Sequence, residues 1–380
     1  MKDYYVILTG GKNNAGDHLI KERAKKLLHW QRPDRNVVDY DGWVTLSDDQ
    51  LKMVNGAKAI ILTGGPALQK KMYPRVYGLR NQLDEIETPI LTMGVGWYSP
   101  KGNWDSTHHY PLSDKSLMLL DRVNESGFLS SVRDYHTLNV LQSNGYKNFL
   151  MTGCPALYDQ ASMDKQVNDL SQVKKIAFSL GVTFKNSTGM YKQSQTILLM
   201  LQKLYPDAII YVVFHHSPSS SYLDSHGANT RLYKINNMFL TWLNSNGFSY
   251  IDISGGVEKL VGFYSQVDFH IGYRIHAHIF MSSISKVSLL LNEDGRGKAL
   301  RDVVGGVMFD AYTKTRINLV TKLVNKLFPL FDTHVPSTGL IVDIENALIY
   351  EKTHGVRFEQ PRIEINQHFQ VMNRFLKQLP

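Results

Sequence analysis

The sequence is poor in cysteine and has no long hydrophobic run. Cys154 is the only cysteine among the 380 residues, which excludes an internal disulfide and a metal site built from several cysteines. No stretch approaches the roughly 18 consecutive apolar residues of a membrane-spanning helix. The first residues, MKDYYVIL, lead directly into a β-prone run and lack a signal-peptide pattern. We therefore expect a cytoplasmic protein.

Several motifs of nucleotide- and nucleic acid-binding proteins are also absent. The chain has no zinc-finger spacing, no basic arm joined to heptads and no RNA-recognition signature, so we do not expect nucleic acid as a partner. Its glycine-rich turns match neither the GxGxxG dinucleotide fingerprint nor the GK[ST] of a P-loop. This argues against an oxidoreductase of the Rossmann type.

Positive charge exceeds negative charge along the whole chain. The formal net charge is +8 and the isoelectric point is near 9.2, and the excess is not gathered into a tail. A basic surface attracts anionic partners. We expect an anionic substrate and, as a further expectation, peripheral contact with the inner face of a membrane. The alternative is charge that serves solubility only.

Short apolar runs that end in Gly, Pro or charged residues alternate with helical patterns. The alternation begins at residue 4, pauses in a polar segment at 159–172 and restarts at residue 175. It predicts an α/β protein with two Rossmann-like, doubly wound domains and a cleft between them, which is a GT-B-like architecture. We place the domains at residues 1–160 and 173–325. Residues 326–380 form a C-terminal extension, with a helix expected to cross back to the first domain.

The most informative strand-to-helix transition lies near Gly272. A β-prone run at 267–271 precedes it, and Arg274, His276 and His278 follow at the start of an apolar helical pattern. Ligands of open α/β sheets bind where strands end and helices begin, and such a cluster can bind an anion and transfer a proton. On a helix the two histidines point about 200° apart. We therefore assign Arg274 to anion binding and His276 to proton transfer, leave His278 out, and expect no metal site. The alternative is a core histidine and a surface arginine.

A glycine-rich turn follows the first β-prone run. Residues 9–17 read TGGKNNAGD, and their glycines allow backbone N–H groups to approach a ligand closely. We expect Gly11, Asn14 and Gly16 to bind substrate. Asp17 is a candidate catalytic carboxylate that activates an acceptor, or else the N-cap of the following helix.

Polar residues also end two other strand-like runs. Arg133 is a candidate anion ligand. Asp134 is a substrate-binding carboxylate that could also activate an acceptor in place of Asp17, or it pairs with a neighbouring arginine or caps the following helix. His215 and His216 follow the run at 208–214 and either contact a phosphate or carboxylate or lie exposed in a turn. If the strand persists, only one of these two histidines points to the site.

Two loops complete the candidate site. Residues 97–109 carry tryptophan, tyrosine and histidine after a strand, which suits stacking on a sugar ring, and Asp105 could bind a sugar hydroxyl. Alternatively, these aromatic residues cover a hydrophobic edge. Residues 293–298 read EDGRGK and suit a flexible loop in which Arg296 is an additional cation, or a merely solvated loop.

Taken in order, these motifs resemble those of the polysaccharide pyruvyl transferase family. The resemblance covers about residues 3–310, and its more specific parts are the Arg-Asp block and the GYRIH core. The segments that carry it are GGKNNAGD at 10–17, GGPAL at 64–68, SVRD at 131–134, TGCPAL at 152–157, the histidine pair at 215–216 and GYRIHAH at 272–278. Pro66 stands where the family often has a third glycine, and the residues after about 310 lie outside the match.

The resemblance implies transfer of pyruvate from phosphoenolpyruvate to a pair of hydroxyls on a sugar, with formation of a ketal. The acceptor would belong to a polysaccharide or a lipid-linked precursor, and neither a metal nor a cofactor is implied. The first domain becomes the acceptor side and the second the donor side. Arg274 and His276 match the family's donor-binding arginine and catalytic histidine, and Arg133 with Asp134 matches its Arg-Asp block.

Two other functions stay open. One is a glycosyltransferase of GT-B-like fold that uses a nucleotide sugar in surface-glycan synthesis. The other is a protein that binds a sugar or lipid-linked precursor without catalysis, which the presence of Arg274, His276 and Asp17 argues against.

Overall fold

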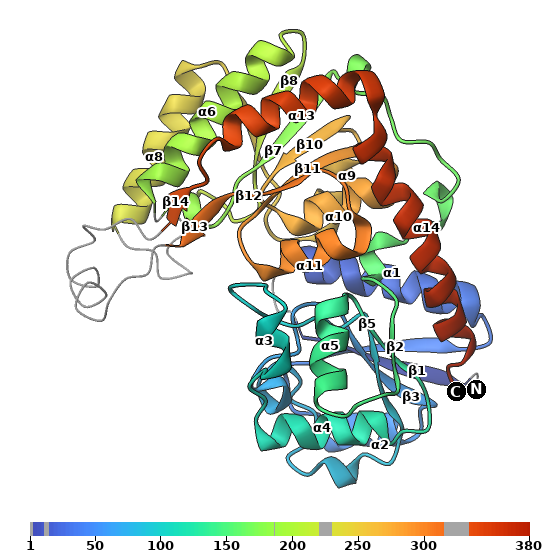
Figure 1. The fold of residues 1–380 in the computed structure, drawn as a ribbon. Helices are drawn as coiled ribbons and strands as arrows, with labels where there is room; N and C mark the ends of the chain where they lie inside the picture. The colour runs from blue at the N-terminus through green and yellow to red at the C-terminus, as the bar shows by residue number, and fades with distance from the viewer. Residues whose placement is uncertain (1–2, 11–14, 186, 220–229, 315–333) are drawn as a thin grey trace. The chain divides into compact units, whose positions relative to one another are not determined.

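The chain folds into two compact α/β units, which are drawn in Figure 1. The computed structural model describes residues 3–10, 15–185, 187–219, 230–314 and 334–380. The first unit comprises Met1–Lys165, Asp294–Gly305 and Gln360–Pro380. The second comprises Gln166–Glu293 and Gly306–Glu359. The segment at 294–305, which the sequence analysis placed in the second domain, therefore packs with the first unit.

The first unit is built on a four-stranded parallel sheet with the order β2-β1-β3-β4. A second parallel pair, β5-β6, continues beyond β4, where the hydroxyl of Thr92 donates to the carbonyl of Ser131 at 2.8 Å. The strands are β1 (Tyr4–Thr9), β2 (Asn36–Asp41), β3 (Ala59–Thr63), β4 (Ile90–Met93), β5 (Ser130–Val132) and β6 (Phe149–Met151). The helices are α1 (Ala15–Gln31), α2 (Asp48–Asn55), α3 (Asp105–His108), α4 (Asp114–Asn124), α5 (Tyr135–Ser143), α11 (Gly295–Val304) and most of α14 (Val356–Lys377).

The second unit is built on a six-stranded parallel sheet with the order β12-β11-β10-β7-β8-β9. Numbered along this unit alone, that order is the 3-2-1-4-5-6 arrangement of the doubly wound Rossmann fold, and its switch point lies between β7 and β10. The strands are β7 (Lys175–Ser179), β8 (Ile209–Phe214), β9 (Ser249–Asp252), β10 (Phe269–Gly272), β11 (Val287–Asn292) and β12 (Met308–Asp310), with an antiparallel pair of β13 (Tyr312–Lys314) and β14 (His334–Pro336). The helices are α6 (Thr188–Leu204), α8 (Thr230–Ser245), α9 (Val257–Tyr264), α10 (Ile275–Ser283) and α13 (Leu340–His354).

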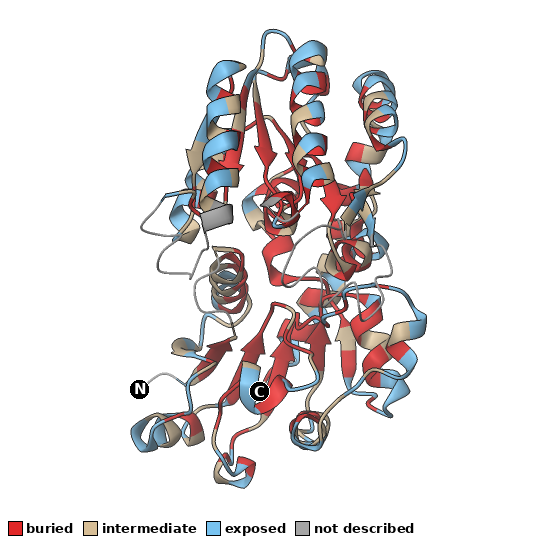
Figure 2. Cartoon of the chain, turned by 90° about the vertical axis from the view of Figure 1, so that its left-hand side faces the viewer, coloured by how far each residue is buried: buried red, intermediate tan, exposed pale blue. Residues whose placement is uncertain are grey.

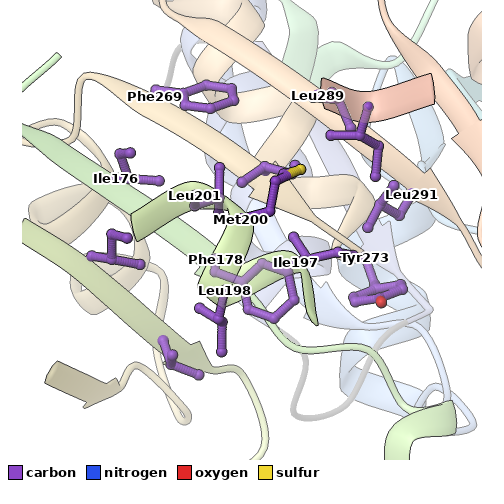
Figure 3. Packing of buried hydrophobic residues seen from close by; sticks show 14 of the residues in the cluster. Ile176, Phe178, Ile197, Leu198, Met200, Leu201, Phe269, Tyr273, Leu289 and Leu291 are labelled. Carbon is purple, nitrogen blue, oxygen red and sulfur yellow. The ribbon is translucent and has the colours of Figure 1, made fainter. Parts of the chain in front are cut away.

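Burial explains why the central strands read as continuous apolar runs. The strands of both sheets are mostly buried, whereas the helices expose their outer faces (Figure 2). In the second unit, Ile197 and Leu201 of α6 pack over Ile176 and Phe178 of β7 (Figure 3). Each such side chain contributes about 1.5–3 kcal/mol when it is fully removed from water.

The α/β fold with two Rossmann-like units is confirmed. None of the helices in the described ranges is both long enough and apolar enough to cross a bilayer. A helical pattern at residues 318–330 predicts a further helix, but this segment lies outside the described residues. The helical spacing of apolar residues at 363–376 predicts a C-terminal helix, and α14 covers these residues but begins earlier, at Val356.

Candidate functional site

The second unit gathers polar residues where β7 and β10 end at the switch point. Ser179 is the last residue of β7, and Gly272 is the last of β10 and its partner in the parallel register. A Cβ on Gly272 would lie 2.4 Å from the carbonyl oxygen of Ser179, and its φ is +149°. Only glycine fits such a conformation at this separation, so Gly272 lets the chain pass close to β7 before α10 begins.

Arg274 occupies the N-cap position of α10 and is held by β7. Its backbone N–H donates to the Ser179 hydroxyl at 3.1 Å, and its side-chain Nε–H donates to the carbonyl of Leu180 at 2.7 Å. These two bonds fix the guanidinium beside the start of the helix. Backbone N–H groups and the helix dipole also favour an anion at a helix N-terminus.

His276 and His215 lie close to Arg274. His276 is in the first turn of α10 and only 8% exposed. His215 follows β8, and its Nε2 lies 2.9 Å from the Tyr264 hydroxyl. Burial lowers the pKa of His215 well below its ordinary value, and Arg274, His270, His276 and His216 lower it further through their charges. The structure therefore brings three predicted site residues, Arg274, His276 and His215, into one basic cluster.

The other two histidines of this region differ in position. His216 is exposed. His278 is fully buried in α10, where its Nδ1 lies 2.7 Å from the Ser288 hydroxyl. Sequence reasoning left His278 out because of its angle to His276, but it did not foresee this contact.

In the first unit, Arg133 lies buried against Gly96 at the end of β5. A Cβ on Gly96 would lie 1.9 Å from the Arg133 Nε, so the guanidinium occupies the space that a side chain would need. Arg133 Nε–H contacts Asp134 Oδ2 at 3.3 Å, and an Nη2 hydrogen is donated to the Trp97 carbonyl at 3.4 Å. Asp134 is the N-cap of α5 and accepts at 2.7 Å from both the N–H and the hydroxyl of Thr137. Asp134 thus both pairs with a neighbouring arginine and caps the following helix, the two structural roles considered for it.

Asp17 lies within the first turn of α1 and is therefore not its N-cap. A Cβ on Gly65 would lie 3.1 Å from Asp17 Oδ1, so the glycine after β3 allows this carboxylate a close approach. Burial raises the pKa of the Cys154 thiol to about 11, Arg133 lowers it, and Asp17 and Asp134 raise it. These three predicted site residues therefore lie around one buried cysteine.

The remaining predicted residues of the first unit have varied surroundings. Gly16 is buried in α1, whereas Gly11 and Asn14 lie outside the described residues. Asp105 is exposed at the start of α3. Arg296 forms a two-point pair with Asp294, at 3.0 Å from Nε to Oδ1 and 2.8 Å from Nη2 to Oδ2. The segment around it is not the expected loop, because Asp294 caps α11 by accepting from the Arg296 N–H at 2.9 Å.

The aromatic segment after β4 is divided between core and surface. Trp97 is fully buried, in keeping with the alternative reading of the loop, whereas Tyr98 and Trp104 are 44% and 46% exposed. The Trp104 ring stacks on His136 with centroids 4.0 Å apart. The Trp104 indole is thus partly exposed and packs against His136.

Sequence reasoning missed Ser179, Tyr264 and His270, which lie beside the basic cluster of the second unit, and Ser288, which contacts His270. One available signal was a histidine inside an apolar strand, because a buried imidazole requires hydrogen-bond partners. His270 has two, with Nε2 2.8 Å from Ser179 Oγ and Nδ1 2.8 Å from Ser288 Oγ. Within the described ranges, no three His, Cys, Asp or Glu side chains are grouped as metal ligands.

Two α/β units, each built on a parallel sheet with polar groups at its strand ends, define a GT-B-like class of protein. Solved structures of similar fold include UDP-GlcNAc 2-epimerase from Neisseria meningitidis bound to UDP-GlcNAc, with 12% identity, 99% of each chain covered and a TM-score of 0.53. They also include the S. aureus MnaA-UDP co-structure, with 11% identity, 100% of this chain and 99% of that chain covered, and a TM-score of 0.50. At these identities the likeness concerns the fold alone.

The family is shown by the sequence itself. The pattern of the polysaccharide pyruvyl transferase family matches residues 14–280, more than half of the chain. The chain therefore belongs to the polysaccharide pyruvyl transferase family, and the resemblance seen in its motifs is confirmed. No curated protein matches the chain.

Proposed function

We propose that this protein transfers pyruvate from phosphoenolpyruvate to two hydroxyls of a sugar in a polysaccharide or lipid-linked precursor and forms a pyruvate ketal. Family membership supports pyruvyl transfer. The observation that carries the choice of donor is the basic cluster of Arg274, His276 and His215 at the switch point of the second unit. Phosphoenolpyruvate carries a carboxylate and a phosphate, and guanidinium, imidazole and backbone N–H groups bind such anions.

The reaction requires one proton delivered to carbon and two removed from hydroxyls. In the proposed sequence, a general acid protonates the methylene carbon, and C2 becomes oxocarbenium-like. One sugar hydroxyl attacks C2 and loses its proton. The bond from C2 to the phosphate oxygen then breaks, and a second hydroxyl attacks C2 and loses its proton, which yields the ketal and inorganic phosphate. Such a sequence needs an acid, a base and a clamp on developing charge.

The residues of the second unit suit the donor half of this reaction. Arg274 is assigned to the donor anion, because its bonds to Ser179 of β7 and to Leu180 just after it hold it at the N-terminus of α10. His276, in the first turn, is assigned to proton transfer. Asp17 is the proposed base for an acceptor hydroxyl, because its carboxylate closely approaches the glycine-rich end of β3 at Gly65.

The test is phosphate release from phosphoenolpyruvate in the presence of a panel of sugar and lipid-linked acceptors. Arg274→Ala should lower the rate by about 10²–10³-fold through loss of charge stabilisation, and His276→Ala by about 10²–10⁴-fold through loss of proton transfer. Arg301→Ala and His354→Ala change exposed residues of the same types and serve as controls. Full activity of either site variant would remove that residue from the mechanism.

A nucleotide sugar is the alternative donor. Proteins of similar fold have been solved with UDP-GlcNAc or UDP bound. A thermal-shift comparison separates the two donors, because only a ligand that binds the folded state raises the unfolding temperature. Stabilisation by UDP, with none by phosphoenolpyruvate, would favour a glycosyltransferase.

A further inference from the structure

Glu293 binds the loop that follows β7. This residue comes directly after β11 and is half-buried. Its Oε1 accepts from the backbone N–H groups of Val182 and Thr183, at 3.0 Å each, and from the Thr183 hydroxyl. Its Oε2 lies 3.1 Å from the Val182 nitrogen. Donors of two consecutive residues thus converge on one carboxylate, and hydrogen bonds to a charged acceptor are roughly twice as strong as neutral ones.

This close contact requires the glycine at position 181. A Cβ on Gly181 would lie 2.3 Å from Glu293 Oε1. Gly181 is not among the glycines with a positive φ, so a side chain would disturb the space beside the carboxylate and not the backbone conformation. Glycine also restricts the neighbouring peptide groups less than any other residue. The orientation of the peptide group between Leu180 and Gly181 therefore depends on contacts outside the local chain.

The carbonyl of that peptide group is the acceptor for Arg274. The buried Leu180 oxygen accepts the Nε–H of Arg274 at 2.7 Å. On the N-terminal side, the Leu180 N–H donates to the Val213 carbonyl of β8 at 3.2 Å. The group that holds Arg274 is thus anchored by β8 before it and by Glu293 after it.

Glu293 is itself held at the end of β11. Its backbone carbonyl accepts from the Tyr312 hydroxyl, and the carbonyl of Asn292 accepts from the Ala311 N–H at 3.0 Å. These bonds tie the end of β11 to the segment that follows β12. Glu293 therefore presents its carboxylate to the β7 loop from an anchored backbone.

We propose that Glu293 is a positioning residue for Arg274. Its carboxylate orders the loop after β7, and the Leu180 carbonyl of that loop then directs the guanidinium of Arg274 towards the donor anion. The role of Arg274 towards the donor rests on the proposed function. The link from Glu293 to Arg274 is a property of the ligand-free protein and can be tested without any substrate.

The signal of the Arg274 Nε–H in ¹H–¹⁵N spectra tests this link, and its loss in Arg274→Lys assigns it. A hydrogen bond to a buried carbonyl slows exchange of this hydrogen with water. We expect Glu293→Ala to speed up the exchange by about 5- to 10-fold, the equivalent of one hydrogen bond. An unchanged rate would overturn the proposal. If Glu293→Ala does not fold, Glu293→Gln, which keeps the size and one acceptor oxygen, should shift the rate in the same direction.

Glu351→Ala is the matched control. Glu351 is a buried carboxylate of the same unit that also accepts a backbone N–H, from Arg357 at 2.9 Å. Its loss should destabilise the protein but leave the exchange rate of the Arg274 Nε–H unchanged. Equal acceleration in the Glu293 and Glu351 variants would reflect general destabilisation and would overturn the specific link.

Gly181→Ala approaches the same contact from the loop. The added Cβ must displace the Glu293 carboxylate, so this variant should reproduce the faster exchange seen in Glu293→Ala. Gly262→Ala adds a Cβ where no atom lies within 4 Å and should not change the signal. A wild-type exchange rate in Gly181→Ala would contradict the dependence of Arg274 on Glu293.

A double-mutant cycle extends the test to the donor. Glu293→Ala should lower kcat/KM for phosphoenolpyruvate by about 5- to 10-fold. In an Arg274→Lys background, which lacks the Nε–H, the same substitution should lower it by less than about twofold, because residues that act through one another are not additive. Equal losses in the two backgrounds would mean that Glu293 does not act through Arg274.

The outcomes separate this proposal from the proposed function. Pyruvyl transfer together with an Arg274 signal that is indifferent to Glu293→Ala would overturn the positioning role alone. The expected change in exchange rate together with no turnover of phosphoenolpyruvate by the wild type would refute the proposed donor and leave the link from Glu293 to Arg274 standing.

Discussion

Gly96 shows how a residue without a side chain can position a charged one. The Arg133 guanidinium fills its missing side-chain space, with Nε, Cζ and Cδ at 1.9, 2.4 and 2.6 Å from a Cβ at that site. Gly96→Ala must displace Arg133 from its contacts with Asp134 and Trp97. We expect a loss of about 1–3 kcal/mol in the free energy of unfolding, measured by chemical denaturation, together with reduced transfer activity.

Gly262→Ala provides the comparison for this substitution. Gly262 lies within α9 and has no atom within 4 Å of an added Cβ, so alanine should be neutral or stabilise the helix by about 0.5–1 kcal/mol. If Gly96→Ala were also neutral or stabilising, the claim that the Arg133 guanidinium fills the space beside Gly96 would be wrong.

Some residues of the candidate site could be predicted from the sequence, and others could not, for a physical reason. Arg274 and His276 were visible because charged groups seldom interrupt apolar runs without a function. Ser179, Ser288 and Tyr264 look like ordinary strand and helix residues. The position of Ser288, for example, depends on the register that sets it beside His270, and register is a property of paired strands that one strand's sequence does not show.

Helix α5 combines a cap and an ion pair in one carboxylate. Asp134 accepts from the Thr137 N–H and faces Arg133. Asp134→Asn keeps the cap and removes the charge, whereas Asp134→Ala removes both. We expect Ala to cost about 3 kcal/mol or more, because it leaves a buried guanidinium without its partner. Asn should cost about 1 kcal/mol less than Ala, the value of the cap.

Denaturation curves of the two variants give this difference directly. Ser113→Ala removes a cap without an ion pair, because its hydroxyl bonds the Ser116 N–H and hydroxyl at the start of α4, and it should cost about 1 kcal/mol. Equal destabilisation by Asn and Ala at position 134 would mean that the cap contributes nothing.

Elements were predicted well where burial gave them a clear period. The helical patterns at residues 135–143 and 257–264 predict helices with the bounds that α5 and α9 have in the structure. The sequence analysis did not identify α2, α4, α11 or α13. The glycines beside Arg296 in the EDGRGK segment favour a loop. The segment instead begins helix α11, because the Asp294 side chain accepts a hydrogen bond from the Arg296 N–H. Caps are short-range contacts that composition alone does not reveal.

For the whole molecule, buried neutral histidines make stability depend on pH. Burial lowers the pKa of His278 to about 3 and that of His270 well below its ordinary value. The unfolded chain takes up these protons below about pH 6.5, before the folded chain does. His278 should therefore lower the free energy of unfolding by up to about 1.4 kcal/mol per pH unit as pH falls from about 6.5 towards 3, and His270 should act in the same direction.

This slope can be assigned to one residue by substitution. His278→Asn keeps a donor near Ser288 and removes the titrating ring, so denaturation at pH 7.5 and 5 should show a shallower loss than in the wild type. His354→Asn alters an exposed histidine of the same unit and should leave the slope unchanged. Identical slopes for His278→Asn and the wild type would contradict the assignment.

The division of the chain between its two units has a consequence for engineering. The chain passes from one unit to the other after residues 165, 293, 305 and 359, so each unit is assembled from separate stretches of sequence. A cut near residue 165 would deprive the N-terminal fragment of α11 and most of α14. Chimaeras that exchange donor or acceptor recognition with a relative therefore need to transplant all the segments of a unit together, with four junctions instead of one.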